Sequence, residues 1–112
     1  MTQPETVICT FRVQPGQEAA FEGLLARHWP TLRKLGLATE TPTQLFKGSE
    51  EGGTFYVEIF EWRSREAAGL AHDQPEVMAI WEPMGGLCEG RGGKQAMSFP
   101  HVQPAGIALA EV

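Results

Sequence analysis

The sequence lacks several features, and each absence argues against a class of protein. Its 112 residues include only two cysteines, Cys9 and Cys88. A disulfide-stabilised secreted domain carries more, so we expect free thiols in a reducing compartment. No apolar run approaches the roughly 18 residues that a membrane helix needs, and residues 1–6 contain neither the basic nor the apolar region of a secretory signal. We therefore expect a cytoplasmic protein without a membrane partner.

Basic residues are also few. The chain has 9 Lys and Arg against 14 Asp and Glu, which gives a formal charge of 9 − 14 = −5. The basic residues are scattered, whereas a nucleic-acid-binding domain gathers them on one face to neutralise phosphates. We therefore expect no nucleic acid as a partner.

Signatures of metal and phosphate sites are absent from the sequence as well. Its three histidines, His28, His72 and His101, lack metal-ligand spacing, and no Cys-x-x-Cys occurs. The segment 85–93 contains five glycines, but Gly93-Lys94 is followed by glutamine rather than serine or threonine, which argues against a phosphate-binding loop. We expect no metal and no cofactor, and we expect this segment to be a mobile loop, either a linker or a lid.

The residue patterns predict one domain over residues 1–112, with 103–112 as a C-terminal tail. Alternation of apolar residues indicates strands, and three- and four-residue spacing indicates amphipathic helices. Pro30 predicts a kink or break near Trp29, and Gly36 predicts a helix end. The predicted elements are a strand at 7–13, a helix at 17–35, strands at 43–47 and 54–62 joined by a turn at 48–53, two helical pieces that meet at 72–75 and end near Pro83, and a strand at 94–102.

This β-α-β-β-α-β order is typical of an α+β ferredoxin-like fold with an antiparallel four-stranded sheet. Both faces of the strand at 54–62 are apolar or aromatic, with Phe55, Val57 and Ile59 on one face. Two helices cover one face, so the same face of a second copy is the simplest cover for the other, and we expect a homodimer. A monomer with a few surface aromatics is the alternative. The tail is either a fifth strand on the partner or a frayed end.

Three stretches resemble a known family over about residues 7–102. They are Val13-Gln14-Pro15-Gly16-Gln17-Glu18-Ala19-Ala20-Phe21, Phe60-Glu61-Trp62-Arg63-Ser64-Arg65-Glu66-Ala67, and Ala71-His72. In these the chain resembles the dimeric α/β-barrel superfamily, and within it the antibiotic biosynthesis monooxygenase-like proteins. The resemblance implies a dimeric barrel. It also implies one of several roles, because members include cofactor-independent oxygenases, haem-degrading enzymes and proteins without a known role. The haem-degrading branch typically carries an asparagine in its first strand, and residues 7–13 have none.

His72 is the predicted catalytic residue. It lies where the two helical pieces meet, and a histidine in such a cleft can act as an acid or base near neutral pH. The alternative is a histidine that only hydrogen-bonds the helix break. Four aromatic residues are predicted to bind substrate, although tryptophan is also a common core residue. They are Tyr56, Phe60, Trp62 and Trp81.

Other polar residues receive structural interpretations. His28 lies on the apolar face of the first helix, where a satisfied core or rim histidine is expected, and His101 is expected at the surface. Glu58 lies on the same face of the strand at 54–62 as Trp62, and an unpaired carboxylate would be costly inside a dry pocket. We therefore consider it for the dimer seam, against Arg12. Cys88 could be a reactive thiol, but no base stands recognisably beside it.

Two functions remain open from the sequence. The first is a cofactor-independent monooxygenase-like enzyme acting on a small aromatic or enolic substrate, as the resemblance implies. The second is a non-catalytic homodimer that binds a small ligand or regulates a neighbour. Haem binding is a third and weaker alternative.

Overall fold

The computed structural model describes residues 3–112. Residues 1 and 2, part of the segment 1–6 that is not expected to be a secretory signal, lie outside the described part. The order of elements is the predicted β-α-β-β-α-β, with the second helix in two pieces. The elements are β1 Glu5–Arg12, α1 Glu18–Lys34, β2 Gln44–Glu50, β3 Gly53–Trp62, α2 Ala67–Ala71, α3 Pro75–Gly86, β4 Met97–Ser98 and β5 His101–Val102.

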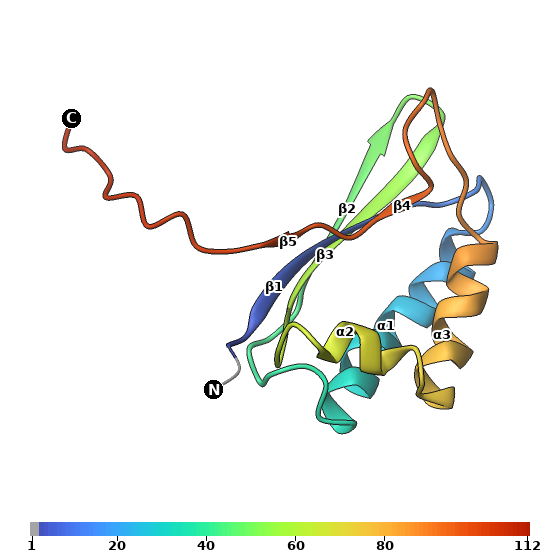
Figure 1. Cartoon of the computed structure of the whole chain (residues 1–112). Coiled ribbons are helices and arrows are strands. Elements are labelled where there is room, and N and C mark those ends of the chain that lie inside the picture. The colour runs from blue at the N-terminus through green and yellow to red at the C-terminus, as the bar shows by residue number, and fades with distance from the viewer. Residues whose placement is uncertain (1–2) are drawn as a thin grey trace.

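The strands form one antiparallel sheet in the order β2-β3-β1-β4, and β5 also pairs with β1. Since β3 occupies one edge of β1, β4 and β5 share the other edge and together fill one strand position. The sheet therefore has four positions in the ferredoxin-like order, which confirms the predicted fold class. All helices lie on one side of this sheet (Figure 1).

The core lies between the sheet and the helices. In the β1–β3 register Val7 pairs with Phe60 and Phe11 with Tyr56, so their side chains share one face. Each of these four is at most 3 % exposed, and they pack against Phe21 and other apolar residues of the helices. The opposite face carries Phe55, Val57 and Ile59, which are half-buried, and Phe46, which is 53 % exposed. The two-residue alternation of the sequence thus decides which side chains meet the helices.

The structure differs from two predictions about proline: the helix does not break near Pro30, and the helix predicted to end near Pro83 is longer. Helix α1 continues through Pro30 to Lys34, because residues on both sides of it, His28 and Leu32, are buried against the sheet. Helix α3 continues through Pro83 to Gly86, with Met84 buried just beyond the proline. Packing on each side of a proline can offset its lost hydrogen bond.

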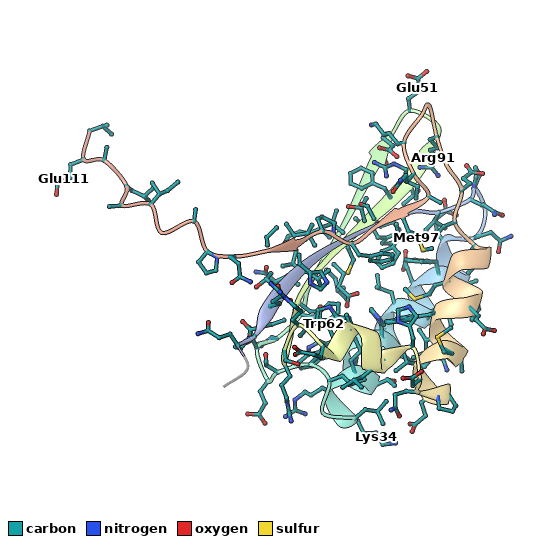
Figure 2. The ribbon with its side chains drawn as sticks, viewed as in Figure 1. Lys34, Glu51, Trp62, Arg91, Met97 and Glu111 are labelled. Carbon is teal, nitrogen blue, oxygen red and sulfur yellow. The ribbon has the colours of Figure 1, made fainter. Side chains whose placement is uncertain are left out.

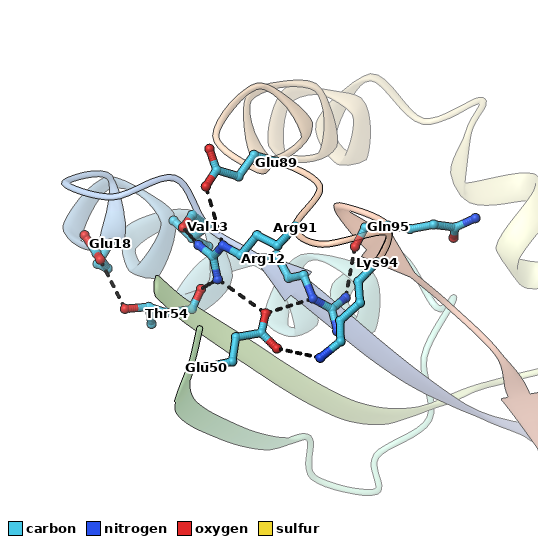
Figure 3. Close-up of polar contacts among 9 residues, drawn as sticks. All are labelled: Arg12, Val13, Glu18, Glu50, Thr54, Glu89, Arg91, Lys94 and Gln95. Atoms are coloured by element: carbon cyan, nitrogen blue, oxygen red, sulfur yellow. Dashed lines mark hydrogen bonds and ion pairs between the residues drawn. The ribbon is translucent and has the colours of Figure 1, made fainter. Parts of the chain in front are cut away.

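The segment 85–93, predicted to be a mobile loop, begins with the last two residues of α3 and is hydrogen-bonded to the β2–β3 hairpin through Arg91. These two strands pair up to Glu50 and Gly53, so the turn is shorter than the predicted 48–53. Arg91 donates to the carbonyl oxygens of Val13 and Thr54, the latter at 2.9 Å, and its Nη1 lies 3.4 Å from Glu50 Oε2 (Figure 3). We name this arrangement the Arg91 latch.

The predicted strand at 94–102 is present only as β4 and β5, separated by Phe99 and Pro100. Proline lacks the N–H that a continuous ladder needs. The tail, residues 103–112, has no regular structure and runs away from the body (Figure 1). Its exposed apolar residues include Ile107 and Leu109. Among residues 3–112, no helix is long and apolar enough to span a membrane.

Candidate functional site

A mostly apolar cavity of about 350 Å³ lies between the sheet and the helices. All of the strands except β2 contribute to its wall, together with residues of each helix and of the α2–α3 junction. Trp62 from β3 and Met97 from β4 extend from the sheet toward the helices (Figure 2). Its lining residues are Val7, Cys9, Phe11, His28, Phe60, Trp62, Ala68, His72, Met78, Trp81, Glu82, Met84, Met97, Phe99 and His101.

Four of the five predicted site residues meet at this cavity. Trp62 contacts Phe60 edge-on, with ring centroids 4.9 Å apart, and is perpendicular to Trp81 at 6.4 Å. The ring of His72 lies 4.9 Å from that of Trp81. An aromatic wall of this kind suits a flat apolar ligand.

Tyr56 is the exception. It shares the inward face of β3 with Trp62, but six residues along a strand separate the two by roughly 20 Å. Its hydroxyl donates to Glu22 Oε2 at 2.5 Å, in a groove lined by Lys47 rather than in the cavity. Burial first, and then the Glu22 carboxylate, raise the pKa of Tyr56, so it stays protonated at neutral pH.

His72 is exposed at the junction of α2 and α3, where the cavity meets solvent. Its Nδ1 lies 3.1 Å from the Ala68 carbonyl oxygen. A carbonyl can only accept, so the neutral ring carries its proton on Nδ1 and leaves the Nε2 lone pair free. A free lone pair on the wall of an apolar cavity is what a general base requires.

A second histidine, which the sequence predicts to be structural, also lines the cavity. His28 of α1 is 3 % exposed, and its Nδ1 lies 2.6 Å from Oε1 of Glu58. Glu58 is fully buried, and its other oxygen accepts from the Thr43 hydroxyl at 3.1 Å. His28 Nε2 accepts from the indole N–H of Trp81 at 2.8 Å.

The dimer-seam interpretation of Glu58 was therefore wrong. Glu58 lies on the helix-covered face of the sheet, while Arg12 points the other way and pairs with Glu50 at 2.9 Å. The signal for the His28–Glu58 pair was present in the sequence. Both residues occupy inward positions of their elements, and a buried carboxylate needs a partner.

The two cysteines are buried free thiols. Burial, and then the charge of Glu58, raise the pKa of Cys9 on the cavity wall. Burial raises the pKa of Cys88 to about 11, against the smaller opposite effect of Arg91. Both are protonated at neutral pH, which does not favour a nucleophilic role. Among the described residues, no group of three His, Cys, Asp or Glu side chains is placed to hold a metal ion.

One residue of the cavity wall has an unsatisfied polar atom. The indole Nε1 of Trp62 is buried and has no hydrogen-bond partner among residues 3–112. A buried N–H without an acceptor is costly, and a ligand oxygen would relieve that cost.

Solved structures share this fold. A variant of SnoaB, a cofactor-independent oxygenase from Streptomyces nogalater, is 19 % identical, with 97 % of this chain and 99 % of that one covered at a TM-score of 0.69. Rv0793 from Mycobacterium tuberculosis is 21 % identical in sequence. The match covers 96 % of this chain and 100 % of Rv0793, with a TM-score of 0.70. A candidate antibiotic biosynthesis monooxygenase from Caulobacter crescentus is 19 % identical in sequence. The match covers 93 % of this chain and 92 % of that protein, with a TM-score of 0.66.

No family model matches the sequence, and no curated protein sequence is significantly similar to it. The structural similarity extends over nearly the whole length of each chain compared. The chain therefore has the ferredoxin-like fold of the antibiotic biosynthesis monooxygenase-like proteins.

Proposed function

We propose that this chain is a cofactor-independent monooxygenase that acts on a small aromatic or enolic substrate in the cavity. The observation that carries the proposal is the meeting of three histidines, His28, His72 and His101, on a predominantly apolar, aromatic wall. A pocket of a few hundred cubic ångströms suits a small molecule. Basic groups beside apolar walls favour ionising a bound hydroxyl or activated carbon.

The proposed reaction needs no external reductant. A histidine removes the hydroxyl proton of a bound phenol or enol. The resulting anion shares its negative charge with a conjugated CH carbon, which adds O2 by electron transfer and radical recombination. The histidine returns the proton, which gives a hydroperoxide. Loss of water from the hydroperoxide breaks the O–O bond and the remaining C–H bond and forms C=O. The CH carbon supplies all the electrons, one oxygen atom stays in the product and the other leaves as water.

The residues of the wall have distinct roles in this proposal. Phe60, Trp62 and Trp81 hold the ring of the substrate, and the unpaired N–H of Trp62 donates to an oxygen that becomes negative. His72 is the sequence-based candidate for the base, and its free Nε2 supports that role. Tyr56 has no part, because its hydroxyl is bonded to Glu22 outside the cavity.

Oxygen uptake with a panel of polyphenols tests the function. Substrate-dependent uptake by the wild type is the expected result, and the absence of uptake with every compound would contradict the proposal. The variant His72→Ala decides whether His72 takes the proton, because removal of a general base slows a reaction by about a hundredfold or more. Equal rates would remove His72 from the mechanism. Leu70→Ala is a matched control on α2, since Leu70 is 54 % exposed and does not line the cavity.

The second candidate function is non-catalytic binding of a small ligand. The predominantly apolar lining of the cavity favours it, because such a wall binds ligands whether or not chemistry follows. Tight binding of polyphenols without oxygen uptake would establish this function in place of the first.

We also propose that two copies pair through the open face of the sheet, in the cytoplasm. Three half-buried residues of β3, Phe55, Val57 and Ile59, form an apolar strip on that face beside exposed Phe46. An apolar strip on a sheet face is an association site, and a two-fold axis would cover both copies at once. The buried free thiols support a reducing compartment.

A further inference from the structure

A chain of hydrogen bonds runs from Thr43, just before β2, to the cavity wall. Thr43 donates to Glu58, Glu58 contacts His28 Nδ1 at 2.6 Å, and Trp81 donates to His28 Nε2 at 2.8 Å. Its four members come from the residue that precedes β2, from β3, from α1 and from α3. Both ring nitrogens of a buried cavity histidine are therefore engaged.

The partners of His28 decide its protonation state. An indole nitrogen can only donate, so Nε2 must present its lone pair to Trp81. The proton of the neutral imidazole is then on Nδ1, where it is donated to the Glu58 carboxylate. In this state a fully buried carboxylate is bonded only to neutral groups, His28 and Thr43.

Charge balance makes His28 a proton acceptor. A proton added at Nε2 would turn the neutral histidine into an imidazolium 2.6 Å from the Glu58 carboxylate, and the buried pair would become electrically neutral. However, a protonated Nε2 and the Trp81 N–H are both donors and cannot face each other. Proton uptake at His28 therefore requires the Trp81 indole to withdraw.

We propose that His28, oriented by Glu58, takes the proton of an acidic hydroxyl bound in the cavity, and that Trp81 occupies Nε2 until such a ligand displaces it. The ligand O–H bond breaks, the Nε2–H bond forms, and the ligand stays as an anion beside the imidazolium. This inference rests on the proposed function, and it gives the proton transfer to His28 rather than to His72. Trp81 is half-exposed and lies between the two histidine rings, at 6.2 Å from His28 and 4.9 Å from His72.

Binding of para-nitrophenol tests the proton transfer without turnover, because its phenolate and its neutral form absorb at different wavelengths. At a pH below the pKa of the free dye, the wild type is expected to bind it as the phenolate. The variants Glu58→Gln and His28→Gln are expected to lose the phenolate band, while Leu70→Ala, at an exposed residue that does not line the cavity, keeps it. A dye bound in neutral form by the wild type, or a phenolate band lost only in His72→Gln, would overturn the inference.

Trp81→Phe is a second test, and it still tests the inference if the His28 or Glu58 variant fails to fold. It removes the competing N–H and keeps an aromatic ring, so the phenolate should bind about three- to tenfold more tightly than to the wild type. A purely structural role for Trp81 predicts weaker binding instead, and that result would contradict the displacement step.

The two proposals fail in different ways. Phenolate formation without oxygen uptake by any polyphenol would keep the His28 inference and contradict the oxygenase. Oxygen uptake by the wild type, together with para-nitrophenol bound in its neutral form, would keep the oxygenase and contradict the His28 inference. Failure of the dye to bind at all would contradict the inference, because the cavity would then not admit an acidic hydroxyl.

Discussion

At the scale of single residues, surroundings rather than residue type set the role of each polar group. His28 and His72 both line the cavity, yet one is buried with both nitrogens engaged and the other is exposed with a free Nε2. His101 lines the same cavity from β5, where it also faces Glu5 at 3.3 Å. Histidine thus occurs in three different hydrogen-bonding states within one small domain.

Trp62→Phe tests the unpaired indole N–H while keeping an aromatic wall. Hydrogen bonds to charged groups are the stronger kind, so the variant should bind the para-nitrophenol anion about tenfold or more weakly. Nitrobenzene, which has no anionic oxygen, should bind the two proteins within about twofold. Titrations monitored by absorbance and by tryptophan fluorescence compare the ligands. Equal weakening for both ligands would show that Trp62 contributes only packing.

Glu50 gives a prediction about pH. Burial on its own raises the pKa of this carboxyl, but the charges of Arg12 and Lys94 outweigh burial and hold the pKa below its ordinary value. The stability that Glu50 contributes is therefore present above the pKa of the unfolded chain, and it is lost as pH falls through the lower pKa of the folded chain. Urea midpoints of the wild type should exceed those of Glu50→Gln at neutral pH and converge with them in acid. A difference that does not change with pH would contradict this role.

At the scale of elements, the Arg91 latch couples the β2–β3 hairpin to the glycine-rich segment. Its guanidinium reaches the carbonyl oxygens of Val13 and Thr54 and the carboxylate of Glu50. The turn must leave space for this side chain. A Cβ on Gly53 would lie 2.8 Å from Arg91 Nη2, and the φ of Gly53 is +142°, in a region that favours glycine.

Gly53→Ala should therefore lower the free energy of unfolding, by about 1–3 kcal/mol. Gly23→Ala is the matched control in the exposed middle of α1, where nothing lies within 4 Å of an added Cβ. It should raise the free energy of unfolding by about 0.5–1 kcal/mol, because alanine is the better helix former. Urea denaturation of the two variants beside the wild type measures both effects. A stable Gly53→Ala protein would mean that the latch can move aside.

At the scale of the whole molecule, the two faces of the sheet differ in what covers them. Helices cover the face with the cavity (Figure 1), and within residues 3–112 no helix covers the face with Val57 and Phe46. The tail, with exposed Ile107 and Leu109, extends away from the same domain. A second copy would shield the open face, and the tail is long enough to reach beyond its own subunit.

Val57→Asp should convert a dimer into a folded monomer, because it places a charge in the proposed interface without touching the cavity. Leu70→Asp is the control on the helix side, where Leu70 is 54 % exposed, and it should stay dimeric. Sedimentation at micromolar concentration with circular dichroism separates dissociation from unfolding. A wild type that sediments as one well-folded subunit would contradict the dimer. Removal of residues 103–112 then tests whether the tail strengthens the pairing.

Much of the candidate site could be predicted from the sequence, and the remainder could not. His72, Trp62, Trp81 and Phe60 lie at one cavity because the strand alternation and the helix junction place them inward. The partnership of His28 and Glu58 spans thirty positions along the chain, and it depends on how α1 crosses β3. Tyr56 was grouped with Trp62 because alternation reports the face of a strand but not which part of it a helix covers.

The amino-acid sequence by itself determined the order of elements, which side chains of β3 share a face, and the helix junction at 72–75, because two- and three-to-four-residue periods and turn residues act locally. Only the tertiary structure decided the continuity of α1 through Pro30, the Arg91 latch and the engagement of His28. Each of these depends on groups far apart in the chain, whose packing outweighs what neighbouring residues favour.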